Sequence, residues 1–185
     1  MTPPAACDPS PGSLLIRDAT LDDLRAIVAI EHDSFQSPWP EWSLREELLV
    51  SDSVYLCAEL EGEIVGYAGM RLVAEEAHIV TIAVVPACRG RGIGEALTLA
   101  LLRRAVEGNA GLAVLEYRVA NQPAAALYEK LGFRKNRIRR GYYDDTGEDA
   151  VEAILAGLDS HAYRQHLDAL TAAWEARRGV RLVTA

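Results

Sequence analysis

Cysteine is scarce in this chain: only Cys7, Cys57 and Cys88 occur among 185 residues, and they share no CxxC spacing. The four histidines also lack the spacing that is typical of metal ligands. The pattern therefore indicates neither a disulfide framework nor a zinc site, and we expect no metal. A reducing cytoplasm is the compartment that this cysteine usage fits best.

Long apolar runs are missing as well. No stretch of about 18 apolar residues occurs, so we expect no transmembrane helix and no membrane partner. The first residues, MTPPAACDPSPGS, contain neither the basic nor the apolar region of a signal peptide. Their prolines predict a disordered tail at 1–13.

Basic residues are outnumbered, 19 against 27 acidic ones, which leaves a formal net charge of −8. Nucleic-acid-binding domains usually carry a basic surface, so we expect no nucleic-acid partner. The acidic balance is compatible with a cationic substrate. Half of the residues are hydrophobic and a quarter are charged, which is typical of a globular protein with one sizeable core.

The apolar pattern predicts helices that alternate with strands. We expect strands at 14–19, 53–60, 63–73, 76–85 and 111–119, with a turn at Glu61-Gly62, and a final hairpin around Thr146-Gly147. Helices are expected at 20–32, 43–50, 92–107, 122–132 and 159–178. This order predicts one α/β domain at 14–158 with a mixed rather than purely parallel sheet, followed by a helical extension at 159–185.

Several residues predict where these helices begin or how they pack. Thr20 caps the first helix, Ser43 and Glu46 form a capping box for the second, and Asn121 caps the fourth. In the extension, Leu167, Leu170 and Trp174 form an apolar stripe, which indicates packing against the domain. The extension could also cover the sheet edge, form a dimer contact or limit a peptide groove.

An arginine–glycine loop follows the strand at 76–85 and opens the helix at 92–107. Glycines let the backbone approach a phosphate, and the N–H groups at a helix start favour an anion. The loop lacks the lysine of a P-loop, and its glycines are spaced GxGxG rather than GxGxxG. The remaining readings are the pyrophosphate loop of an acyl-coenzyme A site, R-x-x-G-x-G, and a plain connecting turn. The loop residues are Arg89, Gly90, Arg91, Gly92, Ile93 and Gly94.

Three segments, IAVVPACRGRGIGEAL, LEYRVANQPAAALYEKLGF and IRRGYYDDTGEDAVEAIL, resemble the GNAT acetyltransferase superfamily over about 14–158. The last two, together with SFQSPWPEWSLREEL, resemble its RimI type, the ribosomal protein alanine N-acetyltransferases. The resemblance implies a mostly antiparallel mixed sheet flanked by helices. It also implies acetyl-coenzyme A as co-substrate, without a metal, and direct acetyl transfer to a protein N-terminus, such as the alanine of a ribosomal protein.

The resemblance also assigns residues to the cofactor. Backbone groups of Ile82, Ala83 and Val84 would pair with the pantetheine arm and polarise the thioester carbonyl. The six loop residues from Arg89 to Gly94 would hold the pyrophosphate. Asn121 would add a hydrogen bond to the cofactor arm.

Two residues are implied to transfer protons. Glu116 would be the general base, through a water, provided that burial raises its pKa toward neutrality. Its alternatives are a solvent-facing carboxylate or a partner of Arg118. Tyr128 would be the general acid for the departing thiolate, or else an ordinary core tyrosine.

Tyr142 and Tyr143 match the tyrosines that hold the substrate's first residues in related enzymes. Since neighbouring strand residues point to opposite faces, only one of them should face the peptide. Phe35, Pro38 and Trp39 would wall the pocket for the first side chain, although packing on the core is an equal reading. Two other functions stay open: acetylation of a small amine, and a non-catalytic acyl-coenzyme A sensor.

Overall fold

The computed structural model describes residues 14–179 and 182–184. The tail predicted at 1–13 lies outside these residues. The described strands form one sheet in the order β6-β7-β5-β4-β3-β2-β1-β8. Neighbouring strands are antiparallel except for the parallel pairs β4–β5 and β1–β8, so the prediction of a mixed, mostly antiparallel sheet is confirmed. The strands are β1 (Leu14–Asp18), β2 (Ser53–Leu60), β3 (Glu63–Val73), β4 (Glu76–Val84), β5 (Leu112–Arg118), β6 (Arg134–Tyr143), β7 (Glu148–Ala156) and β8 (Val183–Thr184).

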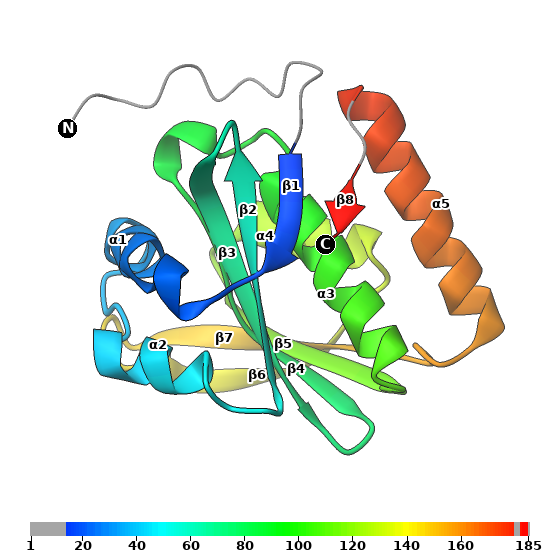
Figure 1. The fold of residues 1–185 in the computed structure, drawn as a ribbon. Coiled ribbons are helices and arrows are strands. Elements are labelled where there is room, and N and C mark those ends of the chain that lie inside the picture. Colours follow the sequence, from blue (N-terminus) through cyan, green and yellow to red (C-terminus); the bar gives the residue numbers. More distant parts are fainter. Residues whose placement is uncertain (1–13, 180–181, 185) are drawn as a thin grey trace.

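Helices cover both faces of the sheet (Figure 1). One face carries α1 and α2, whereas α3 and α4 lie on the other, and α5 runs alongside α3. Short 3-10 turns precede α1 and α3. The helical segments are η1 (Leu21–Asp23), α1 (Leu24–Ser34), α2 (Glu41–Glu47), η2 (Pro86–Cys88), α3 (Ile93–Glu107), α4 (Gln122–Lys130) and α5 (His161–Arg178).

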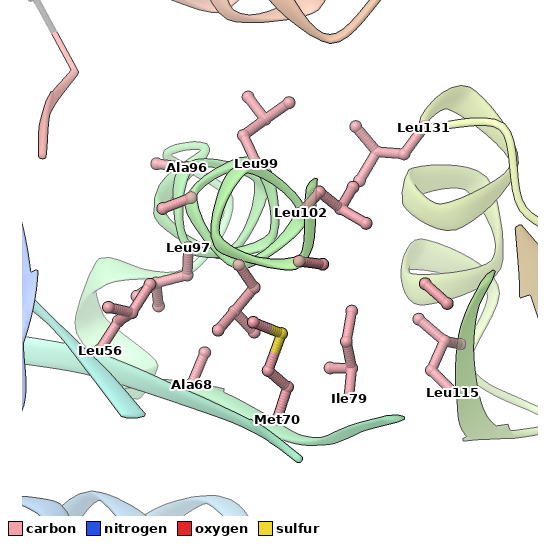
Figure 2. Packing of buried hydrophobic residues seen from close by; sticks show 14 of the residues in the cluster. Leu56, Ala68, Met70, Ile79, Ala96, Leu97, Leu99, Leu102, Leu115 and Leu131 are labelled. Carbon is pink, nitrogen blue, oxygen red and sulfur yellow. The ribbon is translucent and has the colours of Figure 1, made fainter. Parts of the chain in front are cut away.

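The larger core lies between the sheet and α3. Figure 2 shows Leu97 of α3 pointing toward Leu56 of β2, with Met70 and Ile79 beneath the helix. These side chains are at most 4% exposed. Leu131, after α4, closes the core on the far side of α3. This packing holds the beginning of α3, where the glycine loop ends, at a defined place above the sheet.

A smaller core lies on the opposite face, under α1 and α2. Ile27, Ile30 and Leu44 pack there with the rings of Tyr55 and Tyr67. Two carboxylates, Glu31 and Glu47, are buried at its margin. Glu47 is neutralised by Arg71 of β3 and accepts a hydrogen bond from Ser53 at 3.0 Å. The buried charges thereby tie both helices to the strands below.

The capping predictions had mixed outcomes. Asn121 caps α4 as predicted, accepting the N–H of Ala124 at 3.1 Å. The carboxylate of Asp23 accepts the N–H of Thr20 at 2.8 Å and closes the first turn. The capping box at Ser43 is wrong, because α2 begins at Glu41 and the Pro40 carbonyl accepts the N–H of Ser43. Proline, extended at this position, ends the preceding loop and lets the helix start earlier.

The extension packs as its apolar stripe predicts. Leu167 and Trp174 are each 1% exposed, and Leu170 packs against the larger core. After α5 the chain returns to the sheet as β8, which pairs in parallel with β1 and was not predicted. In the part of the chain that the structure describes, no helix is both long and apolar enough to cross a membrane.

Candidate active site and cofactor loop

Strands β4 and β5 are paired over only part of their length. Their register runs from Glu76 opposite Leu112 to Ile79 opposite Leu115. Beyond that point β4 continues to Val84 but pairs only with β3, among the described residues. Backbone groups of Ile82 to Val84 on the β5 side therefore have no strand partner there. An extended molecule could pair with those that remain open, although the Val84 carbonyl already accepts a hydrogen bond from Arg89.

The glycine loop fits an anion. Gly90 and Gly92 have φ of +75° and +80°, left-handed values that side chains rarely adopt. Gly92 is the N-cap of α3, and its carbonyl accepts the first hydrogen bond of the helix, from the N–H of Ala96. The N–H groups of the helix's first turn thus lack intrahelical acceptors, at the positive end of the helix dipole. This is the donor set that a pyrophosphate requires.

Arg89 does not point freely from this loop. Its Nε donates to the Val84 carbonyl at 2.9 Å, and its Nη2 donates to Ser34 Oγ at 3.1 Å. Arg89 therefore ties the loop to the end of β4 and to the last residue of α1. Cys88, just before it, is fully buried in the larger core.

Glu116 is enclosed by two basic side chains. Because Leu115 and Tyr117 belong to the larger core, strand alternation directs Glu116 to the α1 face of the sheet. Its Oε1 accepts a hydrogen bond from Arg139 at 2.6 Å, and its Oε2 lies 2.8 Å from His78 Nε2. The Glu116 side chain is 7% exposed. Arg118 instead pairs with Asp145 and Glu148, so the reading of Glu116 as its partner is wrong.

The contacts of Glu116 with His78 and Arg139 shift the pKa values of Glu116 and His78. Burial raises the pKa of Glu116, but hydrogen bonds and charge from His78 and Arg139 outweigh it and leave that pKa below its ordinary value. The elevated pKa that the sequence analysis required is therefore not found. The same carboxylate raises the pKa of His78 against the effect of its burial. Sequence reasoning missed both partners, because neither His78 nor Arg139 was among the residues to which the sequence analysis assigned a role.

Tyr128 lies on the other side of β5. Its ring centroid is 5.5 Å from that of Tyr117 and 5.8 Å from that of Phe133, both in the larger core. Burial raises the pKa of its phenol, which keeps the proton in place at neutral pH. Glu116 and Tyr128 thus flank β5 from opposite faces, and Asn121 stands at the start of the helix that carries Tyr128.

The tyrosines of the final hairpin depart from strand alternation. Gly141 has a φ of +56°, and the β6–β7 register shifts between Arg139 and Tyr143. As a result the rings of Tyr142 and Tyr143 touch, with centroids 5.1 Å apart at 89°. The prediction that they occupy opposite faces is therefore wrong, because a bulge adds residues to one strand.

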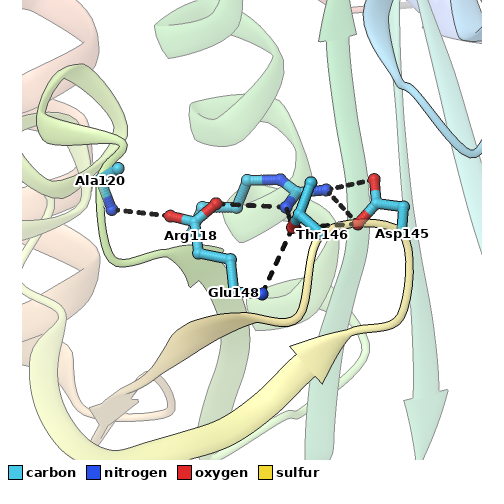
Figure 3. A network of polar contacts seen from close by, with 5 residues as sticks. All are labelled: Arg118, Ala120, Asp145, Thr146 and Glu148. Atoms are coloured by element: carbon cyan, nitrogen blue, oxygen red, sulfur yellow. Dashed lines mark hydrogen bonds and ion pairs between the residues drawn. The ribbon is translucent and has the colours of Figure 1, made fainter.

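A polar network holds this hairpin to the end of β5. Figure 3 shows Arg118 bonded to Asp145, Thr146 and Glu148 of the turn. The guanidinium carbon of Arg118 also lies 3.9 Å from the centroid of the Tyr143 ring. This arrangement fixes the tyrosine pair relative to the strand that carries Glu116.

The segment from Phe35 to Trp39 is anchored by a buried carboxylate. Glu31, 3% exposed, accepts the backbone N–H of Trp39 at 2.9 Å and a hydrogen bond from the Tyr67 hydroxyl. Trp39 packs partly buried on the smaller core, while Phe35 is 38% exposed. Pro38 is half-buried between them. Sequence reasoning missed Glu31, which a charge within an apolar helix stripe could have indicated.

This arrangement is an acyltransferase architecture: a split between parallel strands, a glycine loop at a helix start, and titratable groups on both sides of one strand. Residues 24–133 match the model of the Acetyltransferase (GNAT) family, and the chain belongs to that family. It is an acetyltransferase whose relatives are of the RimI type. Within the described residues, no three His, Cys, Asp or Glu side chains gather in a way that could hold a metal.

Two curated relatives cover most of the chain. A Bacillus subtilis protein provisionally named a ribosomal protein bS18-alanine N-acetyltransferase is 39% identical over 74% of this chain and 91% of its own. The Escherichia coli protein of that name is 35% identical over 72% of this chain and 90% of its own. A crystal structure of the Escherichia coli ribosomal-protein-S18-alanine N-acetyltransferase superposes with a TM-score of 0.72 and 31% identity, covering 76% of this chain and 92% of that one.

Proposed function

We propose that this enzyme transfers an acetyl group from acetyl-coenzyme A to the N-terminal amine of a protein, preferably a ribosomal protein that begins with alanine, in the cytoplasm. The observation that carries the proposal is the placement of Glu116 and Tyr128 on opposite faces of β5, beside the strand split. The names of the relatives support the N-terminal substrate.

The cofactor would be held along the split and the loop. It supplies the activated acetyl thioester. Backbone groups of Ile82, Ala83 and Val84 have no strand partner on the β5 side and would receive the pantetheine arm, one N–H donating to the thioester carbonyl oxygen. The loop from Arg89 to Gly94 would hold the pyrophosphate with its N–H groups. The Asn121 side-chain oxygen already accepts the N–H of Ala124, so its amide nitrogen would serve the arm.

The proton of the incoming ammonium would leave toward the α1 face. Because Glu116 has a lowered pKa, it is a weak base by itself. Its negative charge raises the pKa of His78, which makes the imidazole the better proton acceptor of the pair. We therefore propose that His78 and Glu116 act together, with Glu116 attracting the ammonium and stabilising the imidazolium.

The departing thiolate would be protonated from the α4 face. Tyr128 keeps its phenol protonated because burial raises its pKa. A donor on this side and an acceptor on the other separate the two proton transfers, so neither group neutralises its counterpart. Direct transfer between the two bound substrates needs no enzyme nucleophile.

The peptide would lie on the α1 face. Phe35, Pro38 and Trp39 border this face from one side, and the Tyr142–Tyr143 pair borders it from the hairpin. A tyrosine pair held by Arg118 and Arg139 suits a peptide backbone better than a small free amine, which has no second residue to grip. The tyrosine pair therefore favours a protein N-terminus over a small amine as the substrate.

Mass spectrometry of a peptide panel with acetyl-coenzyme A tests the proposal. The panel carries Ala, Ser, Met or Gly as the free first residue, plus an N-blocked lysine peptide. Acetylation of the alanine peptide, reduced at least about tenfold in Glu116→Gln, His78→Gln and Tyr128→Phe, is the expected result. Glu152→Gln is the matched control, because Glu152 lies opposite Glu116 on the same face but pairs with Arg137.

Two outcomes would contradict the proposal. Coenzyme A binding without product on any peptide would favour a small-amine substrate or a sensor. Full activity in Tyr128→Phe would remove the phenol from the mechanism.

A further inference from the structure

The C-terminal helix reaches the glycine loop. α5 lies beyond residues 24–133, which match the family model, yet its last turns contact Gly92. Trp174 Nε1 donates to the Gly92 carbonyl at 2.9 Å, the same oxygen that accepts the N–H of Ala96. Trp174 is 1% exposed, so this hydrogen bond is shielded from water and holds the cap of α3 in place.

Arg178 lies against the same glycine. A Cβ added to Gly92 would fall 2.9 Å from both Nε and Nη2 of Arg178, so the guanidinium packs directly on the loop. Only a residue without a side chain leaves room for it there. The contact explains the need for glycine at this position in addition to its φ of +80°.

The charges around the loop are unbalanced. Glu95, in the first turn of α3, is already shared by Lys130 of α4 and Arg177 of α5. Arg178 and Arg91 form no ion pair among residues 14–179 and 182–184. Arg178 is half-buried, and it stands at the positive end of the α3 dipole, where a cation is unfavourable. An anion bound between Arg178 and the loop N–H groups would neutralise the arginine charge and interact favourably with the positive end of the helix dipole.

We infer that Arg178 is a ligand of the pyrophosphate of coenzyme A and that Trp174 is the residue that positions the loop for it. The inference rests on the proposed function for the identity of the anion. It makes α5 part of the cofactor site, although the helix lies outside the region shared with the family. A planar guanidinium can donate two parallel hydrogen bonds to phosphate oxygens, which suits this place.

Calorimetric titration separates the phosphates of the cofactor. Wild type and Arg178→Gln are titrated with coenzyme A, with 3′-dephospho-coenzyme A and with pantetheine, which has no phosphate. We expect Kd to rise about tenfold for the first two ligands and to stay unchanged for pantetheine. Arg178→Lys should give an intermediate Kd, because lysine keeps the positive charge but cannot donate two parallel hydrogen bonds.

Arg164→Gln is the matched control. Arg164 is exposed in the first turn of the same helix, about 21 Å from Arg178 along its axis. It should bind all three ligands as wild type does. Trp174→Phe should raise Kd for the two phosphate-containing ligands, with circular dichroism showing a folded chain.

Three results of these titrations would contradict the role of Arg178. An unchanged Kd in Arg178→Gln overturns the inference alone. A loss seen with coenzyme A but absent with the 3′-dephospho form places Arg178 at the 3′-phosphate and also overturns it. A wild-type chain that binds neither form overturns the proposed function, and the inference with it.

Discussion

Arg139 Nη1 lies 2.6 Å from Glu116 Oε1, and the same guanidinium stands 4.4 Å from the centroid of the Tyr142 ring. One side chain therefore connects the group proposed for proton transfer to the group proposed for peptide binding. The connection is possible because the bulge at Gly141 brings Tyr142 over Arg139. Movement of the hairpin would change the charge around Glu116.

Replacing Arg139 should shift the pH dependence of catalysis. The charge of Arg139 lowers the pKa values of both Glu116 and His78, so Arg139→Gln raises both. The acidic limb of kcat/KM should move to higher pH, with a larger loss at pH 6 than at pH 8. Arg137→Gln is the control, because Arg137 pairs with Glu152 at 2.6 Å. Superimposable acidic limbs in wild type and Arg139→Gln would contradict the assignment.

Removing the charge of Glu31 should loosen the peptide loop. Glu31→Gln weakens the bonds from Trp39 and Tyr67, and hydrogen bonds to buried charged groups are worth about 1.5–3 kcal/mol. We expect a loss of unfolding free energy of that order in urea, and a higher KM for peptide but not for acetyl-coenzyme A. Tyr67→Phe, which keeps the Trp39 contact, should affect stability more than peptide KM. Equal changes in both KM values would argue against a role confined to the loop.

The loop glycines should differ in their tolerance of alanine. Gly90→Ala meets only the strain of a left-handed φ, about 1–2 kcal/mol, because nothing lies within 4 Å of its Cβ position. Gly92→Ala adds contacts with Arg178 and Trp174 at 2.9–3.0 Å and should cost more. Gly94→Ala, with ordinary contact to Val84 at 3.9 Å, should scarcely change stability. Thermal unfolding of the three variants gives the order, and a Gly90→Ala that is less stable than Gly92→Ala would reverse it.

Asp23 should contribute stability that acid removes. Hydrogen bonds from Arg17 lower the pKa of Asp23 to about 2, against the effect of burial. A lowered folded-state pKa stabilises the fold above the unfolded value near 4, and the contribution is lost as the pH falls through about 2. Urea unfolding should show Asp23→Asn less stable than wild type at pH 7 by about 1–3 kcal/mol, with the gap narrowing below pH 4. Asp22→Asn, at the exposed neighbouring position, should show no such gap.

Most element boundaries followed from short patterns. The turn at Glu61 and Gly62 forms where it was predicted, and Gly62 and Gly132 have φ of +85° and +101°, left-handed values that favour glycine. These features depend on sterics within a few residues, which the sequence displays directly. The start of α2 was predicted wrongly because Pro40 and Ser43 are both acceptable helix starts, and in the structure the Pro40 carbonyl accepts the N–H groups of Ser43 and Leu44.

The candidate site was only partly predictable. Glu116, Tyr128 and the glycine loop were identified through a resemblance that preserves order and spacing along the chain. The partners of Glu116 were not visible, because His78 and Arg139 lie 38 and 23 residues away in sequence and meet it only across the sheet.

Local chemistry in the chain was thus sufficient for most of its strands and helices, for its glycine loop and for the family to which it belongs, but not for β8 or for the start of α2. Tertiary structure alone decided which charges meet: Arg139 and His78 around Glu116, Glu31 under Trp39, and Arg178 on Gly92. The reason is physical. Backbone conformation is set by neighbours along the chain, whereas the pKa of a side chain depends on burial and on charges a few ångströms away in space.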